Sequence, residues 1–153
     1  MDNNLTLTVY SIQAVFTFEK KNRMTLKDTI EAVAQFHDAF GIENNFKPTT
    51  GISEQEMELR HRLMQEENDE YLEAAKRGDM IEVADALGDQ LYILCGTILK
   101  HGMQDKIAEV FQEIQRSNMS KLDADGKPIY REDGKVMKSE LYFKPDIAKV
   151  LEN

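Results

Sequence analysis

The most constraining feature of the chain is a long apolar segment, residues 80–100, that carries three acidic side chains. Ile, Val, Leu and Ala fill about half of it, and Glu82, Asp85 and Asp89 interrupt it at spacings of three and four residues. In a helix these spacings place the carboxylates on one stripe. Because burying an unpartnered carboxylate is very costly, the stripe must face solvent, pair with bases or bind cations. The segment therefore predicts a helix that is central or lies in a subunit interface.

A second acidic stripe lies on the preceding segment, residues 53–77. This segment begins with a Ser-Glu-Gln-Glu capping box and ends at a short Gly-Asp turn, which predicts a helix antiparallel to the one after it. The acidic side chains of this stripe are Glu66, Glu67 and Glu70, followed by Glu73 as a reserve ligand. Facing carboxylates on two helices suit Mg²⁺, which takes oxygen ligands and often shares them with substrate phosphates. The pair of segments predicts a magnesium site.

The expected hairpin leaves the two stripes out of register. At ~1.5 Å of rise per residue, Glu67 and Glu70 lie about 13–17 Å from the turn, and Glu82 and Asp85 about 5–10 Å from it. An earlier end to the first helix, a tilt, or long side chains would close this gap. Two other readings stay open, since acidic helix stripes are often solvated faces. The carboxylates could also form a structural network with nearby arginines, for which the candidates are Arg60 and Arg62.

The remaining elements predict an all-α fold, a helical bundle of about four to five helices with a small C-terminal β-hairpin. The further helices are expected at residues 25–40, at residues 104–117 and, briefly, after Pro145. An Asp-Gly step at residues 133–134, between two short extended segments, predicts the hairpin turn. Residues 1–23 have a different composition and form an expected N-terminal extension, which leaves residues 24–153 as one domain.

Charge and composition restrict the partners. The net charge is −9, and such a surface repels a phosphate backbone, so duplex nucleic acid is an unexpected partner. No apolar stretch reaches the ~18 residues of a membrane helix, so we expect no membrane partner. The opening residues lack the features of a signal peptide, and the single cysteine, Cys95, lies in an apolar run where it fits as a small hydrophobe. We expect a cytoplasmic protein.

The acidic motifs resemble those of a known superfamily. EENDE followed by EVADALGDQLY is similar to the all-α nucleoside triphosphate pyrophosphohydrolases, which include MazG, the dimeric dUTPase-like enzymes and the phosphoribosyl-ATP pyrophosphohydrolases. Their pattern is E-E-x-x-E, a spacer, then E-x-x-D. An alternative frame aligns ALGD with the E-L-G-D of MazG, but Ala86 would then replace a ligand. The segments RSNMSKL and DGK…K resemble the phosphoribosyl-ATP pyrophosphohydrolase-like branch, so the resemblance covers about residues 25–150.

The resemblance implies a metal-dependent hydrolase that is at least a homodimer, with a homotetramer as the other expectation. It implies Mg²⁺, or Mn²⁺ in its place, and cleavage between the α- and β-phosphates of a nucleotide. Its pattern places the metal ligands at Glu67, Glu70, Glu82 and Asp85. Glu66 corresponds to a position proposed to activate the water, which a carboxylate can orient and deprotonate.

Further residues are candidates for substrate binding. Asn118 and Lys121 belong to the SNMSK segment, where an amide and an ammonium can hold phosphate oxygens. Asp89 is a candidate for the second shell around the metal or for a contact with the substrate. Tyr92 is either a substrate contact or a core residue. His37 lies near two phenylalanines and is either part of a base pocket or structural.

Together these features predict a Mg²⁺-dependent nucleotide pyrophosphohydrolase that converts a (d)NTP or related nucleotide to a monophosphate and pyrophosphate, in a house-cleaning role. One alternative is a non-catalytic helical oligomer that binds a nucleotide or a partner. The other is a phosphoribosyl-ATP pyrophosphohydrolase proper. The sequence does not distinguish the base or the sugar of the substrate.

Overall fold

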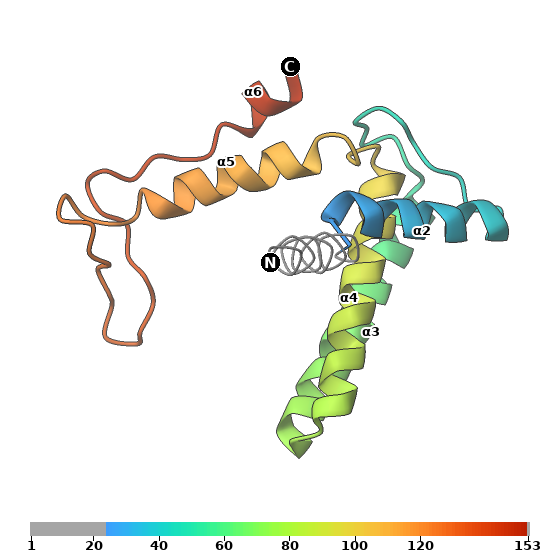
Figure 1. The fold of residues 1–153 in the computed structure, drawn as a ribbon, viewed down its shortest axis with the longest axis horizontal. Helices are drawn as coiled ribbons and strands as arrows, with labels where there is room; N and C mark the ends of the chain where they lie inside the picture. Colours follow the sequence, from blue (N-terminus) through green and yellow to red (C-terminus); the bar gives the residue numbers. More distant parts are fainter. Residues whose placement is uncertain (1–23, 153) are drawn as a thin grey trace, which may run out of the picture.

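The computed structural model describes residues 24–152, and in this range it contains five helices (Figure 1). The expected N-terminal extension, residues 1–23, lies outside the described residues. The helices are α2 (Leu26–Phe40), α3 (Glu54–Arg77), α4 (Met80–Lys100), α5 (Ile107–Met119) and α6 (Ile147–Glu152). The predicted all-α class is confirmed. No helix of the described range is long and apolar enough to cross a membrane.

Local signals in the sequence determine where the first three helices begin and end. Capping boxes start two of them, with Thr25 and Asp28 at α2 and Ser53 and Glu56 at α3. A glycine in the left-handed conformation caps the end of each helix, Gly41 after α2 at φ 68° and Gly78 after α3 at φ 70°. The side chain of Asp79 then accepts hydrogen bonds from the first amides of α4. The predicted boundaries of these helices therefore agree with the structure to within one residue.

The α3–α4 hairpin and α2 form the body of the molecule, while α5 extends away from the hairpin and packs mainly against α6 (Figure 1). The core lies where α2 crosses the second half of α4. It consists of Ile30, Val33, Cys95, Ile98 and Leu99. Cys95 is fully buried, as expected for a cysteine that fills space in a core.

The loop between α2 and α3 is attached to the end of α4. The side chain of Asn45 donates to the carbonyl of Lys100 at 2.7 Å, and the ammonium of Lys100 donates to the carbonyl of Glu43 at 2.9 Å. Thr49 donates its amide to the carbonyl of His101 at 3.0 Å. The bonds from Asn45 and Thr49 satisfy carbonyls at the end of α4 that have no intrahelical partners. They also fix α2 and the start of α3 relative to α4.

In the C-terminal third of the chain, the structure differs from two of the predictions. Helix α5 begins three residues later than the predicted residue 104, because the chain first makes a turn in which Lys106 and Ile107 both donate to the carbonyl of Met103. The tail turns at Gly134 (φ 82°), close to the predicted position, but the described part forms only one isolated antiparallel bridge, between Tyr130 and Val136. A regular β-hairpin is therefore unconfirmed.

Gly102 allows the α2–α3 loop to approach the end of α4, and substitution should show it. Gly102 and Gly41 have positive φ values of 65° and 68°, where alanine costs about 1–2 kcal/mol. A Cβ at Gly102 would lie 2.1 Å from the carbonyl oxygen of Lys47, whereas Gly41 has nothing within 4 Å. In urea unfolding, Gly102→Ala should therefore lose at least about 2 kcal/mol more than Gly41→Ala. Equal losses would contradict the close approach.

Candidate functional site

The α3–α4 hairpin brings the two acidic stripes together in a register that one hydrogen bond reveals. The side-chain amide of Gln90 on α4 donates to the backbone carbonyl of Glu67 on α3 at 3.2 Å. Glu67 therefore lies opposite Gln90 and its neighbour Asp89. Glu82 is seven residues before Asp89, nearly two turns closer to the connecting turn. The misregister expected from the sequence is present, and Asp89 is level with Glu67.

Glu67 lies at the centre of the acidic cluster. Its Oε2 is buried and has no hydrogen-bond partner in the described structure. Burial raises the pKa of the Glu67 carboxyl above its usual range, and the charges of four neighbouring carboxylates raise it further. These carboxylates belong to Glu70, Asp89, Asp85 and Glu66. A partly buried carboxylate oxygen without a donor, surrounded by negative charge, is an arrangement that a cation would stabilise.

The other acids of the motif lie around Glu67 with exposed side chains. Glu66 is 3.9 Å from the guanidinium of Arg62, one turn earlier on α3. Glu70, Asp85 and Asp89 are exposed. Glu82 is exposed in the first turn of α4, and it is not among the carboxylates that raise the pKa of Glu67.

The acids are close enough to interact electrostatically without forming a closed ligand set. Across residues 24–152, no three Asp, Glu, His or Cys side chains converge as metal ligands do. Because like charges repel, exposed carboxylates are expected to spread apart when no cation lies between them. The long, exposed side chains of this cluster are free to rotate inward. The residues fit a divalent cation in donor chemistry and charge, and the unpartnered Glu67 oxygen is the observation that supports the fit.

Aromatic side chains lie beyond the acids on α4. Tyr92 is 40% exposed, and its ring meets that of Phe36 on α2 edge to face, with centroids 5.7 Å apart. His37 is only 3% exposed, and its Nδ1 donates to Oδ1 of Asn44 at 2.6 Å. Tyr92 therefore presents an accessible ring on the acidic side of α4. His37 has a structural hydrogen bond, with its Nε2 left to face the interior.

Asn118 and Lys121 lie beside each other but away from the acids of their own chain. The ammonium of Lys121 donates to Oδ1 of Asn118 at 2.8 Å. Both residues lie at the far end of α5, which runs away from the α3–α4 hairpin (Figure 1). The structure thus brings this predicted phosphate-binding pair together, but it does not bring the pair to the acidic cluster within one chain.

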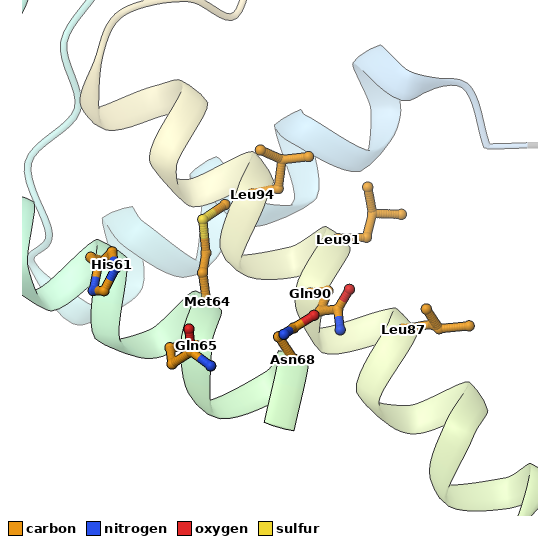
Figure 2. Close-up of a pocket in the computed structure, with 8 residues that line it drawn as sticks. All are labelled: His61, Met64, Gln65, Asn68, Leu87, Gln90, Leu91 and Leu94. Carbon is orange, nitrogen blue, oxygen red and sulfur yellow. The ribbon is translucent and has the colours of Figure 1, made fainter. Parts of the chain in front are cut away.

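The hairpin also carries an apolar groove of about 530 Å³ between α3 and α4 (Figure 2). Its walls consist of His61, Met64, Gln65, Asn68, Leu87, Gln90, Leu91 and Leu94. Leu91 lies about 200° around α4 from Asp89, since each residue of a helix turns by ~100°. The groove is therefore on the face of the hairpin opposite the acids.

Sequence reasoning proposed Arg60 and Arg62 as partners of the acids, and the structure separates them. Arg62 has the long contact with Glu66 described above, whereas the guanidinium of Arg60 lies over Gly96 of α4. The ion pair that the sequence did not predict joins the buried ammonium of Lys100 to the half-buried carboxylate of Glu56. Its signal was the lone lysine at the end of an apolar helix.

An all-α fold with acids on two antiparallel helices is the architecture of the MazG-like nucleoside triphosphate pyrophosphohydrolases. The sequence model of the phosphoribosyl-ATP pyrophosphohydrolase family matches residues 33–118, which is more than half of the chain. The chain belongs to this family of hydrolases acting on phosphoric anhydrides, whose enzymes generally use a divalent metal. The match includes all the acids and ends at Asn118, before Lys121. A comparison with curated proteins found no match.

The buried charge of Glu67 should be measurable as a stability cost. A carboxyl whose pKa is raised in the folded state destabilises that state above the pKa of the unfolded chain, and the cost disappears at lower pH. Without divalent cations at neutral pH, Glu67→Gln should therefore raise Tm by about 2–4 °C. Millimolar Mg²⁺ should raise Tm of the wild type and have little effect on the variant.

Glu58→Gln, an exposed position on the same helix, is the matched control and should behave as the wild type. A lower Tm of Glu67→Gln without cations, or an equal response of both proteins to Mg²⁺, would show that Glu67 is not a cation ligand.

Proposed function

We propose that the protein is a Mg²⁺-dependent nucleotide pyrophosphohydrolase that cleaves the α–β anhydride of a (d)NTP or related nucleotide in a house-cleaning role. The observation that supports this most directly is the buried, unpartnered Glu67 oxygen among four further carboxylates. Phosphoribosyl-ATP is the second candidate substrate, because the matching family is described by its cleavage.

Glu67, Glu70, Asp85 and Asp89 are the proposed ligands of the cation. This set differs from the sequence motif in one member, since Asp89 takes the place of Glu82. The reason is the hairpin register, which puts Asp89 level with Glu67. A bound Mg²⁺, or Mn²⁺, would neutralise charge on the substrate phosphates and lower the pKa of water.

Glu66 is the proposed general base. It belongs to α3 beside Glu67 and is exposed, so a water molecule can reach its carboxylate. In the proposed reaction, the water oxygen forms a bond to one phosphorus of the anhydride, and the bond from that phosphorus to the bridging oxygen breaks. The carboxylate of Glu66 orients the water and accepts its proton. Tyr92 is an accessible ring for substrate contact on the same side, and His37 supports that region from within.

The proposed assembly is a homodimer or homotetramer, in which a second copy covers the groove between α3 and α4. Leu87, Leu91 and Leu94 follow one another at steps of four and three on α4, and each is 43–49% exposed. Ala74 is the only buried residue of α3, and a helix pair with so few buried side chains needs further apolar contacts for stability. Association would also allow Asn118 and Lys121 of one copy to approach the acids of another.

The reaction is tested by incubating the purified protein with Mg²⁺ and a panel of nucleotides that includes phosphoribosyl-ATP. We expect a monophosphate and pyrophosphate in equal amounts. Asp89→Asn should lower kcat/KM by at least about 100-fold as a lost ligand, whereas Glu82→Gln should change it by less than about 5-fold. The reverse order would restore Glu82 as the ligand, and the absence of turnover with every nucleotide would contradict the proposed activity.

The assembly is tested by light scattering on size-exclusion chromatography. Leu91→Glu should reduce the molar mass to that of a smaller species, because it places a charge in the groove without a partner. Ile81→Glu is the control, since Ile81 is 81% exposed on the same helix and lies outside the groove. A monomeric wild type, or a Leu91→Glu variant with unchanged mass, would contradict the interface.

A further inference from the structure

Arg60 is a partly buried cation that has no direct partner in the described residues. It lies on α3 and takes part in no hydrogen bond or ion pair there. Burial lowers the pKa of its guanidinium, and the nearby charge of Glu56 offsets this only in part. Since a partly desolvated guanidinium loses contacts with water, it is expected to have an anionic partner. Residues 24–152 of the same chain supply none.

Glu56 is the carboxylate whose charge acts on Arg60, but both of its oxygens already have other partners. One of its oxygens pairs with the ammonium of Lys100, which is 5% exposed. The other accepts from the backbone amide and the hydroxyl of Ser53, at 3.2 and 3.1 Å. The Lys100 contact and the Ser53 bonds lower the pKa of Glu56 to about 2, so this carboxylate stays ionised and bound in place. Arg60 therefore has its five N–H donors available for another anion.

The guanidinium of Arg60 occupies space that only a glycine leaves open. A Cβ at Gly96 of α4 would lie 3.0 Å from Nη1 of Arg60 and 3.2 Å from Nε2 of His37. Side chains from α2 and α3 thus converge on the bare backbone of α4. Nδ1 of His37 is bonded to Asn44, so Nε2 is the ring nitrogen that remains at this point.

This point and the acidic cluster lie at two levels of one face of the α3–α4 hairpin. Arg60 precedes Glu67 by seven residues, and Gly96 follows Asp89 by seven. Seven residues are nearly two turns, so each pair shares a helix face and is separated by about 10 Å. Tyr92 lies between the levels on α4. A ligand held at the acids can extend along this face toward Arg60.

We propose that Arg60, with His37 beside it over Gly96, is an anion subsite that binds a phosphate of the nucleotide other than the two joined by the cleaved bond. The inference rests on the proposed function. A guanidinium fork matches the oxygens of a phosphate, and a site at this distance from the acids reaches a second anionic group of the same ligand. The phosphate of a second ribose fits this separation directly. The terminal phosphate of a triphosphate, one bridging oxygen from the cleaved anhydride, fits when the Arg60 side chain bends toward the acids.

The test compares four variants with the wild type in steady-state kinetics. Arg60→Gln should raise KM about tenfold or more and change kcat by less than about 3-fold, because it removes charge-assisted hydrogen bonds made in the bound state. Arg60→Lys should recover part of this loss. Gly96→Ala should also raise KM, since the added methyl displaces Arg60 without changing its charge. Gly88→Ala is the matched control, since a Cβ at Gly88 has nothing within 4 Å.

The substrates identify the phosphate. If Arg60 binds the terminal phosphate, Arg60→Gln raises KM for a nucleoside triphosphate and not for the diphosphate. If it binds a phosphate on a second ribose, Arg60→Gln raises KM for phosphoribosyl-ATP and not for ATP. Calorimetry gives a second readout. It measures the binding of an α,β-imido triphosphate and of an α,β-imido analogue of phosphoribosyl-ATP. The affinity for at least one of them should fall in Arg60→Gln by about the factor by which KM rises.

Unchanged KM and affinities in a folded Arg60→Gln variant would overturn the subsite, as would a loss confined to kcat. A wild type that hydrolyses no nucleotide, but binds one of the imido analogues less tightly after Arg60→Gln, would contradict the proposed function and still support the subsite. Circular dichroism and thermal melts establish that each variant is folded.

Discussion

The carboxylate of Glu67 is partly buried among other carboxylates, and the cost of this arrangement affects the whole hairpin. The packing of α3 against α4 partly buries Glu67 and leaves the other acids exposed around it, so the contact that joins the helices also concentrates negative charge. The hydrogen bond from Gln90 holds this register. A divalent cation would convert the repulsion into coordination, since a bound cation reverses the local sign of the field. Metal binding and hairpin stability are therefore coupled.

The face of the hairpin that carries these acids has opposite charges at two levels. Carboxylates around Glu67 suit a cation, and the guanidinium of Arg60, about two turns away, suits an anion. A nucleotide bound to Mg²⁺ carries both kinds of group. The leucine groove on the opposite face of the hairpin has no comparable polarity and suits a second copy. The two faces of one helix pair thus have separate roles in this account, one in chemistry and the other in assembly.

Local sequence signals predicted the helices well, because caps and turns depend on neighbouring residues. The box formed by Ser53 and Glu56 and the glycine turns are examples. The motif predicts a ligand at Glu82 where the proposed set has Asp89, since a spacing pattern carries no information about hairpin register. Arg60 meets Gly96 because of the hairpin register, whereas His37 reaches Gly96 through a loop that holds α2 against α4, over more than fifty residues of sequence separation. No local pattern contains that contact.

Diffraction from crystals grown with Mn²⁺ and an α,β-imido nucleotide tests the central claim most directly, because anomalous scattering locates the cation independently of activity. The account predicts an anomalous peak in direct coordination with the carboxylates of Glu67 and Asp89, with the anhydride of the nucleotide bound beside it. Acids that remain unbound, with the cation or the nucleotide at another place in the molecule, would contradict it.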